Sequence, residues 1–470
     1  MTEQKIGWSA LLSGSNGIRS LALAGGVALH AINVYIATTI LPSVVAEIGG
    51  LDYYAWNTTL FIVASIIGSV LSANLLAVSG PRGAYVVAAG LFGLGTFICA
   101  LAPSMPILLL GRFVQGLGGG LLFALAYAMI RLVFPQALWP RAMAVVSGMW
   151  GVATLAGPAI GGTFAELGSW RMAFWAVLPT TGLFAALAFA ILPGRSPDTD
   201  EKPGLAVPQL ALLILAVFVV SLGSVNPKLV WNIAGIAAAL FLVAILVLIE
   251  GRAETRLLPR GAFRLSSPLC MLFVTISVLA IAVTVSEMFI PLFLQVLHAQ
   301  TPLIAGYLSV LMSVGWTMGS IMSSSNQGRR AEKAVRLAPV VALSGMILLA
   351  LLMPGGSQGE WLVLGPLSAA FILVGAGVGI SWPHLLTRIL QAAPPGEQDL
   401  ASASITTVQL FATALGSALA GMVVNLAGLT DPGGHAGTQN AAFWLFAVFA
   451  IAPLIGVFSA ARALGKDERR

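Results

Sequence analysis

The sequence predicts an all-α integral membrane protein in which fourteen transmembrane helices are arranged as six, two and six. Two observations lead to this fold class. The 470-residue chain is 58% hydrophobic and only 9% charged, a far lower charge than soluble domains carry. Apolar runs of about 20 residues, the length that crosses a bilayer as a helix, recur along the whole chain.

The first six expected spans precede PGRSPDTDEKPG, a polar linker rich in Pro and Gly. The first span follows a stretch of mixed polarity and is long enough to cross the bilayer, so we expect a signal anchor that stays in the membrane. Residues 1–193 therefore form the expected N-terminal six-helix half. Its spans cover residues 19–41, 55–78, 84–102, 105–130, 142–165 and 172–193.

A central pair of spans, 208–224 and 229–249, is separated by SVNPK, where Pro227 cannot continue a helix. This pair lies within a linker region, residues 194–266, which contains the charged segment EGRAETRLLPRGAFR. Residues 267–470 form the expected C-terminal half with a short cytoplasmic tail. Its six spans cover residues 267–296, 302–325, 337–354, 361–390, 401–427 and 441–463.

The distribution of basic residues predicts that both termini are cytoplasmic. With that orientation, all of the 23 Lys and Arg residues except Arg112, Arg171 and Lys228 fall on the inner side, as the positive-inside rule requires. Charge alone leaves a twelve-span arrangement open, because removing the central pair keeps the parity. The net charge of +6 does not indicate a nucleic-acid partner, since no basic stripe with interleaved aromatic residues occurs.

One arginine, Arg112, stands inside the apolar run LLLGRFVQGLGGGLLFALA. Gln115, Gly116 and Gly119 share its helix face at i+3, i+4 and i+7. The glycines would let a neighbouring helix approach, so that its carbonyl groups could accept from the guanidinium. An uncompensated arginine at the centre of a span costs about 2.5–3.5 kcal/mol. The alternative is that Arg112 extends toward water at the helix end.

Two other ionisable residues lie deep in the expected spans, Glu287 and His30. Pro291 lacks the N–H that would bond the carbonyl of Glu287, so this turn can be hydrated. An ionisable residue inside a membrane is a functional hypothesis by default. We predict that Glu287 exchanges protons, with His30 as a second candidate. A structural hydrogen bond from Glu287 and a packing role for His30 are the alternatives.

Several segments resemble motifs of one transporter family. GRFVQGLGGG is similar to the helix 4 signature of the major facilitator superfamily, and GVATLAGPAIGG to its antiporter motif. SWRMAFW and MFIPLFLQVLHAQTPLIAGYLSVL resemble segments of the 14-helix drug:proton antiporter family within it. The resemblance covers nearly the whole chain. The conformational motif residues that it assigns are Gly157, Pro158, Gly161, Gly162, Gly80 and Arg82.

This resemblance implies two six-helix halves around a cavity that opens alternately to either side. It also implies that Arg112 couples proton movement to the conformational change, and that Gly157 and Pro158 act as a hinge or seal. Two positions depart from the family pattern. Ala77 occupies the usual acidic position in the loop before Gly80, and Asn33 replaces the usual Asp of the first helix. Asn cannot titrate, so another group must carry any coupled proton.

Polar and aromatic residues predict a cavity for amphipathic or cationic molecules. Ser402, Thr406 and Gln409 form a polar stripe at i, i+4 and i+7 of one helix. Such a stripe could equally make interhelical hydrogen bonds worth under about 1 kcal/mol each. The residues expected to line the cavity are Asn33, Phe61, Gln115, Met288, Gln295, Ser402, Thr406 and Gln409.

These features together predict a secondary active transporter that exports small amphipathic or cationic molecules in exchange for protons. We expect a monomer in the bacterial plasma (inner) membrane, whose partners are the substrate, protons and the lipid bilayer. One alternative is a lipid or metabolite exporter, or a facilitator, without proton coupling. Another is a membrane sensor that does not transport.

The sequence does not predict an enzyme, a metal site or a cofactor. It contains no HExxH, CxxC or P-loop lysine motif. The Gly-x-Ser-x-Gly match, GGSQG at 355–359, lies in a short expected loop and not between a strand and a helix. We interpret it as a chance match.

Overall fold

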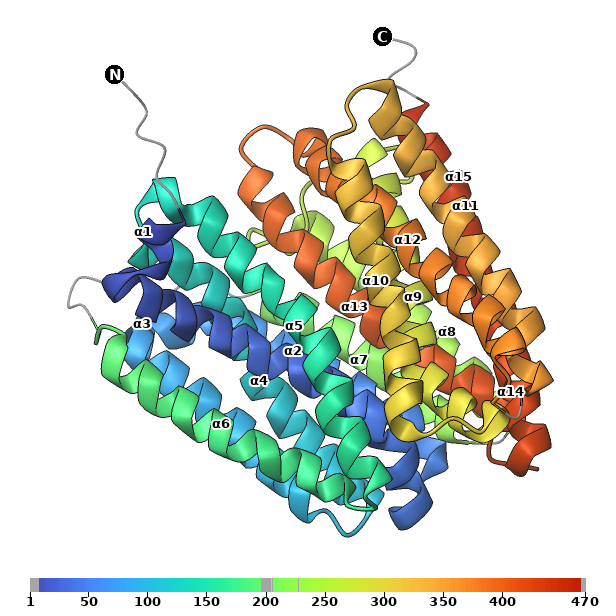
Figure 1. Ribbon diagram of the computed structural model, residues 1–470. Helices are drawn as coiled ribbons and strands as arrows, with labels where there is room; N and C mark the ends of the chain where they lie inside the picture. The colour runs from blue at the N-terminus through green and yellow to red at the C-terminus, as the bar shows by residue number, and fades with distance from the viewer. Residues whose placement is uncertain (1–7, 196–203, 205, 227, 358, 466–470) are drawn as a thin grey trace. The chain divides into compact units, whose positions relative to one another are not determined.

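The computed structural model describes residues 8–195, 204, 206–226, 228–357 and 359–465, and no strand forms among them. Thirteen helices in this part of the chain are long and apolar enough to cross a membrane. The longest, residues Leu51–Leu101, departs from helical geometry at Gly80, where φ is 68°, and therefore supplies two spans. The fold is thus an all-α membrane fold with fourteen spans in a six, two and six order, as predicted (Figure 1).

The first compact unit comprises Met1–Gly49 and Leu60–Leu205. Within it, α2 packs against α5, and α2 also contacts α4 and α6 (Figure 1). The helices of this unit are α1 (Ser9–Leu12), α2 (Gly14–Ile48), α3 (Tyr54–Leu101) from Leu60 onward, α4 (Met105–Val133), α5 (Trp139–Glu166) and α6 (Trp170–Ile191), with the short 3-10 helix η2 (Gln136–Leu138) before α5.

The second compact unit comprises Gly50–Thr59 and Ala206–Arg470, so the first turns of α3 belong to it. Its central helix is α9. In the most apolar 18-residue stretch of this helix 78% is buried, a larger share than in any other described span. The helices are η1 (Leu51–Tyr53), α7 (Val207–Val225), α8 (Leu229–Arg252), α9 (Pro268–His298), α10 (Pro302–Ser324), α11 (Arg329–Leu352), η3 (Met353–Gly355), α12 (Trp361–Ala392), α13 (Gln398–Leu426), α14 (Gly434–Phe449) and α15 (Ile451–Leu464).

The central pair, α7 and α8, lies in this second unit. The two helices pack on each other, and α7 also contacts α13. Close approach is possible because Gly223 and Gly235 face the partner backbone, where a Cβ on Gly235 would lie 2.7 Å from the carbonyl oxygen of Val219. Small residues allow this backbone contact between helices in a membrane.

Several helices continue beyond the predicted spans. The first extends over Gly14–Ile48 instead of 19–41, and α11 begins at Arg329 instead of 337. A helix satisfies its own backbone and does not have to end at the edge of the hydrocarbon layer. The last predicted span, 441–463, consists of α14 and α15, which meet at Ala450. Pro453 contributes to this break, since it cannot donate to the carbonyl of Phe449.

The turn at Gly80, between the two spans that α3 supplies, contacts the segment that follows α6. A Cβ on Gly80 would lie 2.5 Å from the Cα of Arg195, and its positive φ also favours glycine. Arg82 fixes the same contact through its backbone N–H, 3.1 Å from the carbonyl of Pro193, and its Nε, 3.1 Å from that of Leu192. Its guanidinium also lies 5.1 Å from the ring centre of Phe189.

Candidate functional site

The guanidinium of Arg112 is buried inside the first unit, with 2% of the residue exposed. Its Nη1 donates to Oε1 of Gln115, one turn further along α4, at 2.6 Å. Its Cζ lies 4.2 Å from the ring centre of Phe61, a cation–π contact from α3. An arginine inside a span has no water to bond, and these two contacts take the place of that hydration. The contact to Gln115 is a side-chain contact within α4.

Gln115 extends this contact to two further helices. Its Nε2 lies 3.0 Å from Oδ1 of Asn33 on α2 and 2.8 Å from Oγ1 of Thr96 on α3. Thr96 in turn donates to the carbonyl of Phe92 at 2.7 Å. Asn33, Thr96 and Gln115 are fully buried. Because buried polar groups are costly when unpaired, this network fixes α2, α3 and α4 around Arg112.

The glycines beside Arg112 allow this packing. A Cβ on Gly116 would lie 2.3 Å from the carbonyl oxygen of Phe61, and one on Gly119 would lie 2.7 Å from Nδ1 of His30. Backbone and ring atoms of α3 and α2 therefore occupy the space that larger residues would need. The face predicted from the spacing of Arg112, Gln115, Gly116 and Gly119 is a packing face.

His30 lies in an aromatic cluster of the first unit. Its ring centre is 5.3 Å from that of Phe61, 5.5 Å from that of Phe123 and 6.1 Å from that of Trp150. Only 7% of His30 is exposed, and its Nδ1 has no hydrogen-bond partner among the described residues. These surroundings fit the packing role that we considered as the alternative.

Glu287 lies on α9 among hydroxyl groups of the second unit. Oγ of Ser313 on α10 donates to its Oε1 at 3.4 Å. One turn earlier on α9, Thr284 bonds Thr413 of α13 at 3.5 Å between the two hydroxyl oxygens. Glu287 is only partly exposed, as are Ser313 and Thr413. The structure therefore gives this carboxyl a long hydroxyl contact from α10, and a second hydroxyl pair joins α9 to α13 one turn away.

The other predicted cavity residues are placed differently. Met288 is buried, with 2% exposed. Gln295 is half-buried, and its Nε2 has no hydrogen-bond partner within the described part of the chain. Of the polar stripe on α13, Ser402 and Thr406 are exposed and Gln409 is half-buried. Around Arg112 in the first unit, Gln115 bonds Asn33, and Phe61 contacts the guanidinium of Arg112.

The antiporter-motif residues of α5 pack against α2. A Cβ on Gly157 would lie 2.3 Å from that of Tyr35, and one on Gly161 would lie 3.1 Å from the carbonyl oxygen of Ile36. Pro158 and Gly162 are buried between these contacts. Pro158 also removes one backbone hydrogen bond from α5. The motif thus combines a tight helix contact with a weakened turn.

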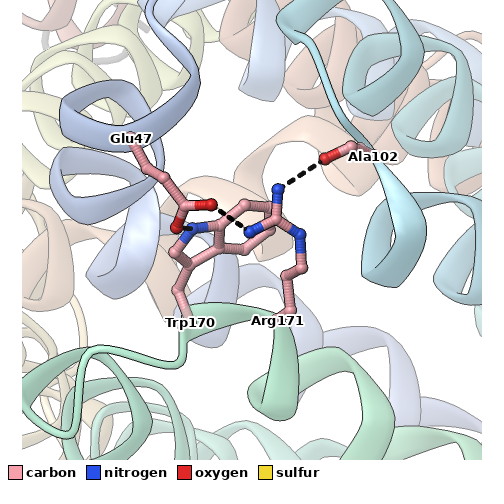
Figure 2. A network of polar contacts seen from close by, with 4 residues as sticks. All are labelled: Glu47, Ala102, Trp170 and Arg171. Atoms are coloured by element: carbon pink, nitrogen blue, oxygen red, sulfur yellow. Dashed lines mark hydrogen bonds and ion pairs between the residues drawn. The ribbon is translucent and has the colours of Figure 1, made fainter.

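A polar cluster that sequence reasoning missed joins the ends of α2, α3 and α6 (Figure 2). Glu47 forms an ion pair with Arg171 and accepts from the indole Nε1 of Trp170 at 2.6 Å. Arg171 also donates to the carbonyl of Ala102 at 2.9 Å, and its Cζ lies 4.2 Å from the Trp170 ring centre. Trp170 and Arg171 belong to SWRMAFW, so this motif holds three helix ends together.

Other site residues had weaker signals in the sequence. Thr284 stands three residues before Glu287, and that spacing alone could have placed both on one face. Nothing in the sequence distinguishes Thr96 or Phe123 from other residues of their spans. No group of three His, Cys, Asp or Glu side chains that could hold a metal ion occurs among the described residues.

Comparison with known proteins identifies the family and close relatives. The family model described as Major Facilitator Superfamily matches residues 23–417. A probable multidrug-efflux transporter of Mycobacterium tuberculosis (strain H37Rv) is 40% identical, over 98% of this chain and 97% of the relative. Multidrug resistance protein 3 of Bacillus subtilis (strain 168) is 26% identical, over 86% of this chain and 78% of the relative.

Solved structures share the fold at low sequence identity. An inward-facing bacterial homologue of the human lysosomal transporter Spinster has a TM-score of 0.67 at 15% identity, covering 96% of both chains. A D-xylose–proton symporter has a TM-score of 0.65 at 15% identity, covering 96% of this chain and 98% of its own. These similarities support the helix arrangement and do not define a substrate.

Proposed function

Because the chain belongs to the major facilitator superfamily, we propose that it exports small amphipathic or cationic molecules in exchange for protons. Members of this family are multi-pass membrane transporters and not enzymes, as the sequence predicted for this chain. The relatives described as multidrug-efflux and multidrug-resistance proteins support export from the bacterial cell across the plasma membrane. They also make a sensor that does not transport a poor alternative.

Proton exchange is assigned to Glu287 because of its surroundings. The observation that carries this assignment is the position of its carboxyl on α9, with a hydroxyl donor, Ser313, at 3.4 Å. A hydroxyl can donate to the ionised carboxylate or accept from the protonated acid, so both states keep a partner. Pro291, four residues on, weakens the backbone of the same turn and allows water to reach it.

Arg112 serves a different purpose in this proposal. Arginine does not deprotonate in proteins, so it cannot carry the proton itself. Its contacts to Gln115 and Phe61 fix a positive charge inside the first unit. We assign it the role of holding the network of α2, α3 and α4 in one arrangement, which conformational change would have to reorganise.

Asn33 supports the alternative of an exporter or facilitator whose transport is not coupled to protons. By the resemblance to the drug:proton antiporter family, Asn33 stands at the usual Asp position of the first helix, and its amide is bonded to another amide, Gln115. This pair holds the helices together without a titratable group. A chain that lacks that acid could move its substrate without protons, and the experiment below separates the two mechanisms.

The test is uptake of lipophilic cations and neutral amphiphiles into everted membrane vesicles, with and without an imposed pH gradient. Wild type, Glu287→Gln and Glu254→Gln are compared, since Glu254 is an exposed carboxyl outside the spans. We expect gradient-driven uptake in wild type and Glu254→Gln and its loss in Glu287→Gln, with substrate binding retained.

Two results would contradict parts of the proposal. Equal gradient-driven uptake in all three proteins would remove the assignment of Glu287 and leave proton coupling to another group. Uptake in wild type that ignores the pH gradient would favour the uncoupled exporter or facilitator.

A further inference from the structure

A surface hollow of about 300 Å³ lies at the C-terminal end of α8, and its lining includes none of the residues assigned to transport. Leu248, Ile249, Arg252 and Ala253 line it. Its lining is therefore apolar, with one basic side chain, Arg252, at the C-terminal end of the helix. Arg252 is exposed and has no hydrogen bond or ion pair with any described residue.

The helix face above the hollow is apolar and exposed. Phe241, Ala244 and Leu248 precede Arg252 by eleven, eight and four residues, a spacing that places all four on one side of α8. Phe241 is 67% exposed and Leu248 is 66% exposed. An alkyl chain can lie along this face, with Ala244 leaving a depression between the two larger side chains.

The length of α8 places Arg252 at the level of the lipid headgroups. Its 24 residues extend about 36 Å, which exceeds the roughly 30 Å thickness of the hydrocarbon layer. The residues at its C-terminal end therefore reach the interface while Phe241 and Leu248 remain against the lipid tails. The basic end is the one that the sequence predicts to face the cytoplasm.

The nearest buried carboxyl does not neutralise Arg252. Glu250 is 5% exposed, and its Oε1 accepts from the backbone N–H groups of Leu257 and Leu258, each at 2.7 Å. Glu250 is two residues from Arg252 and lies on the opposite side of the helix. Glu254 is exposed in the linker, two residues after Arg252, and no ion pair joins the two among the described residues.

A second arginine bonds one of the lining residues. The Nε of Arg256 donates to the carbonyl of Ala253 at 3.2 Å. Gln209 of α7 also holds the linker through the carbonyl of Thr255 at 2.9 Å. Arg256 offsets the negative end of the helix dipole, which would otherwise oppose an anion.

We propose that this hollow binds an anionic phospholipid, with its phosphate at Arg252 and Arg256 and one acyl chain along Phe241, Ala244 and Leu248. Guanidinium groups match phosphate oxygens in charge and geometry. Basic side chains next to a membrane span attract anionic lipids. A zwitterionic lipid would fit the apolar face but lacks the net charge that two arginines complement.

The test measures lipid retained by the purified full-length protein, using native mass spectrometry with phosphatidylglycerol or phosphatidylcholine added in detergent. The variants are Arg252→Gln and, as a matched control, Lys228→Gln at the other end of α8. We expect wild type and Lys228→Gln to retain phosphatidylglycerol over phosphatidylcholine. Loss of one basic residue should weaken phosphatidylglycerol binding about fivefold in Arg252→Gln.

Two controls separate the possible causes. Arg252→Lys keeps the charge and should retain most of the preference, which shows that a loss in Arg252→Gln does not come from misfolding. Inorganic phosphate should not displace the lipid. Equal retention of both lipids by wild type, no change in Arg252→Gln, or displacement by inorganic phosphate would each overturn the proposal.

Discussion

Gln115 on α4 donates to Asn33 on α2 across 3.0 Å, and both side chains are fully buried. The same amide group also donates to Thr96, while its oxygen accepts from Arg112. The amide of Gln115 therefore both donates and accepts inside the first unit. The polar contacts among α2, α3 and α4 depend on this one side chain.

Replacing Gln115 should be costly for this reason. Gln115→Ala removes the amide that bonds Arg112, Asn33 and Thr96, and leaving a buried polar group unsatisfied costs about 1–3 kcal/mol. We expect a clear decrease in the thermal unfolding temperature in detergent. Gln136→Ala, at an exposed position in η2, should leave it unchanged. Equal unfolding temperatures in both variants would contradict the network.

The tight contact at Gly116 gives a second prediction. A Cβ there would lie 2.3 Å from the carbonyl oxygen of Phe61, so Gly116→Ala should cost about 1–3 kcal/mol through overpacking. Gly90 on α3 has no atom within 4 Å of the equivalent Cβ position. Gly90→Ala should be neutral or gain up to about 1 kcal/mol from helix propensity. Thermal unfolding of the two variants in one detergent distinguishes these outcomes.

Gly80 combines a positive φ with a close backbone contact to Arg195. Gly80→Ala places a Cβ in the left-handed region at a cost of about 1–2 kcal/mol and displaces the end of α6 as well. Gly194→Ala, whose Cβ position meets no atom within 4 Å, is the control in the segment after α6 that Gly80 contacts. We expect lower expression and earlier unfolding in the first variant only. The reverse order would contradict the docked turn.

The ion pair between Glu47 and Arg171 should be a weak stabiliser despite its position in the Figure 2 cluster. Their side chains are 48% and 32% exposed, and exposed pairs contribute about 0.2–1 kcal/mol. A double-mutant cycle with Glu47→Ala and Arg171→Ala should give a coupling energy in that range. A coupling of several kcal/mol would mean that the pair is shielded from water to a degree that its exposure does not indicate.

The spans were predictable because a bilayer demands long apolar helices, and the chain shows them directly. The turn at Gly80 was also predictable from its loop sequence. The ends of the helices were not, as α2 and α11 show, because polar residues such as Arg329 continue a helix outside the hydrocarbon layer. The length of an apolar run follows the thickness of the hydrocarbon layer, so it does not give the residue at which a helix begins or ends.

The site was predictable only in part. The spacing of Arg112 and Gln115 placed them on one face, and their bond agrees with it. The partners on other helices were not accessible, since Gln115 and Asn33 are 82 residues apart and Glu47 and Arg171 are 124 apart. Such contacts depend on how helices pack, which no local pattern in one sequence encodes.

The most direct test of the central assignment is proton movement itself. Everted vesicles are loaded with protons, a lipophilic cation is added, and a pH-sensitive dye follows the lumen. Wild type should release protons as substrate enters, so that the pH gradient decreases, whereas Glu287→Gln should bind the substrate without any proton release. Equal proton release from both proteins would contradict the role of Glu287, and no release from wild type would contradict proton exchange as the mechanism.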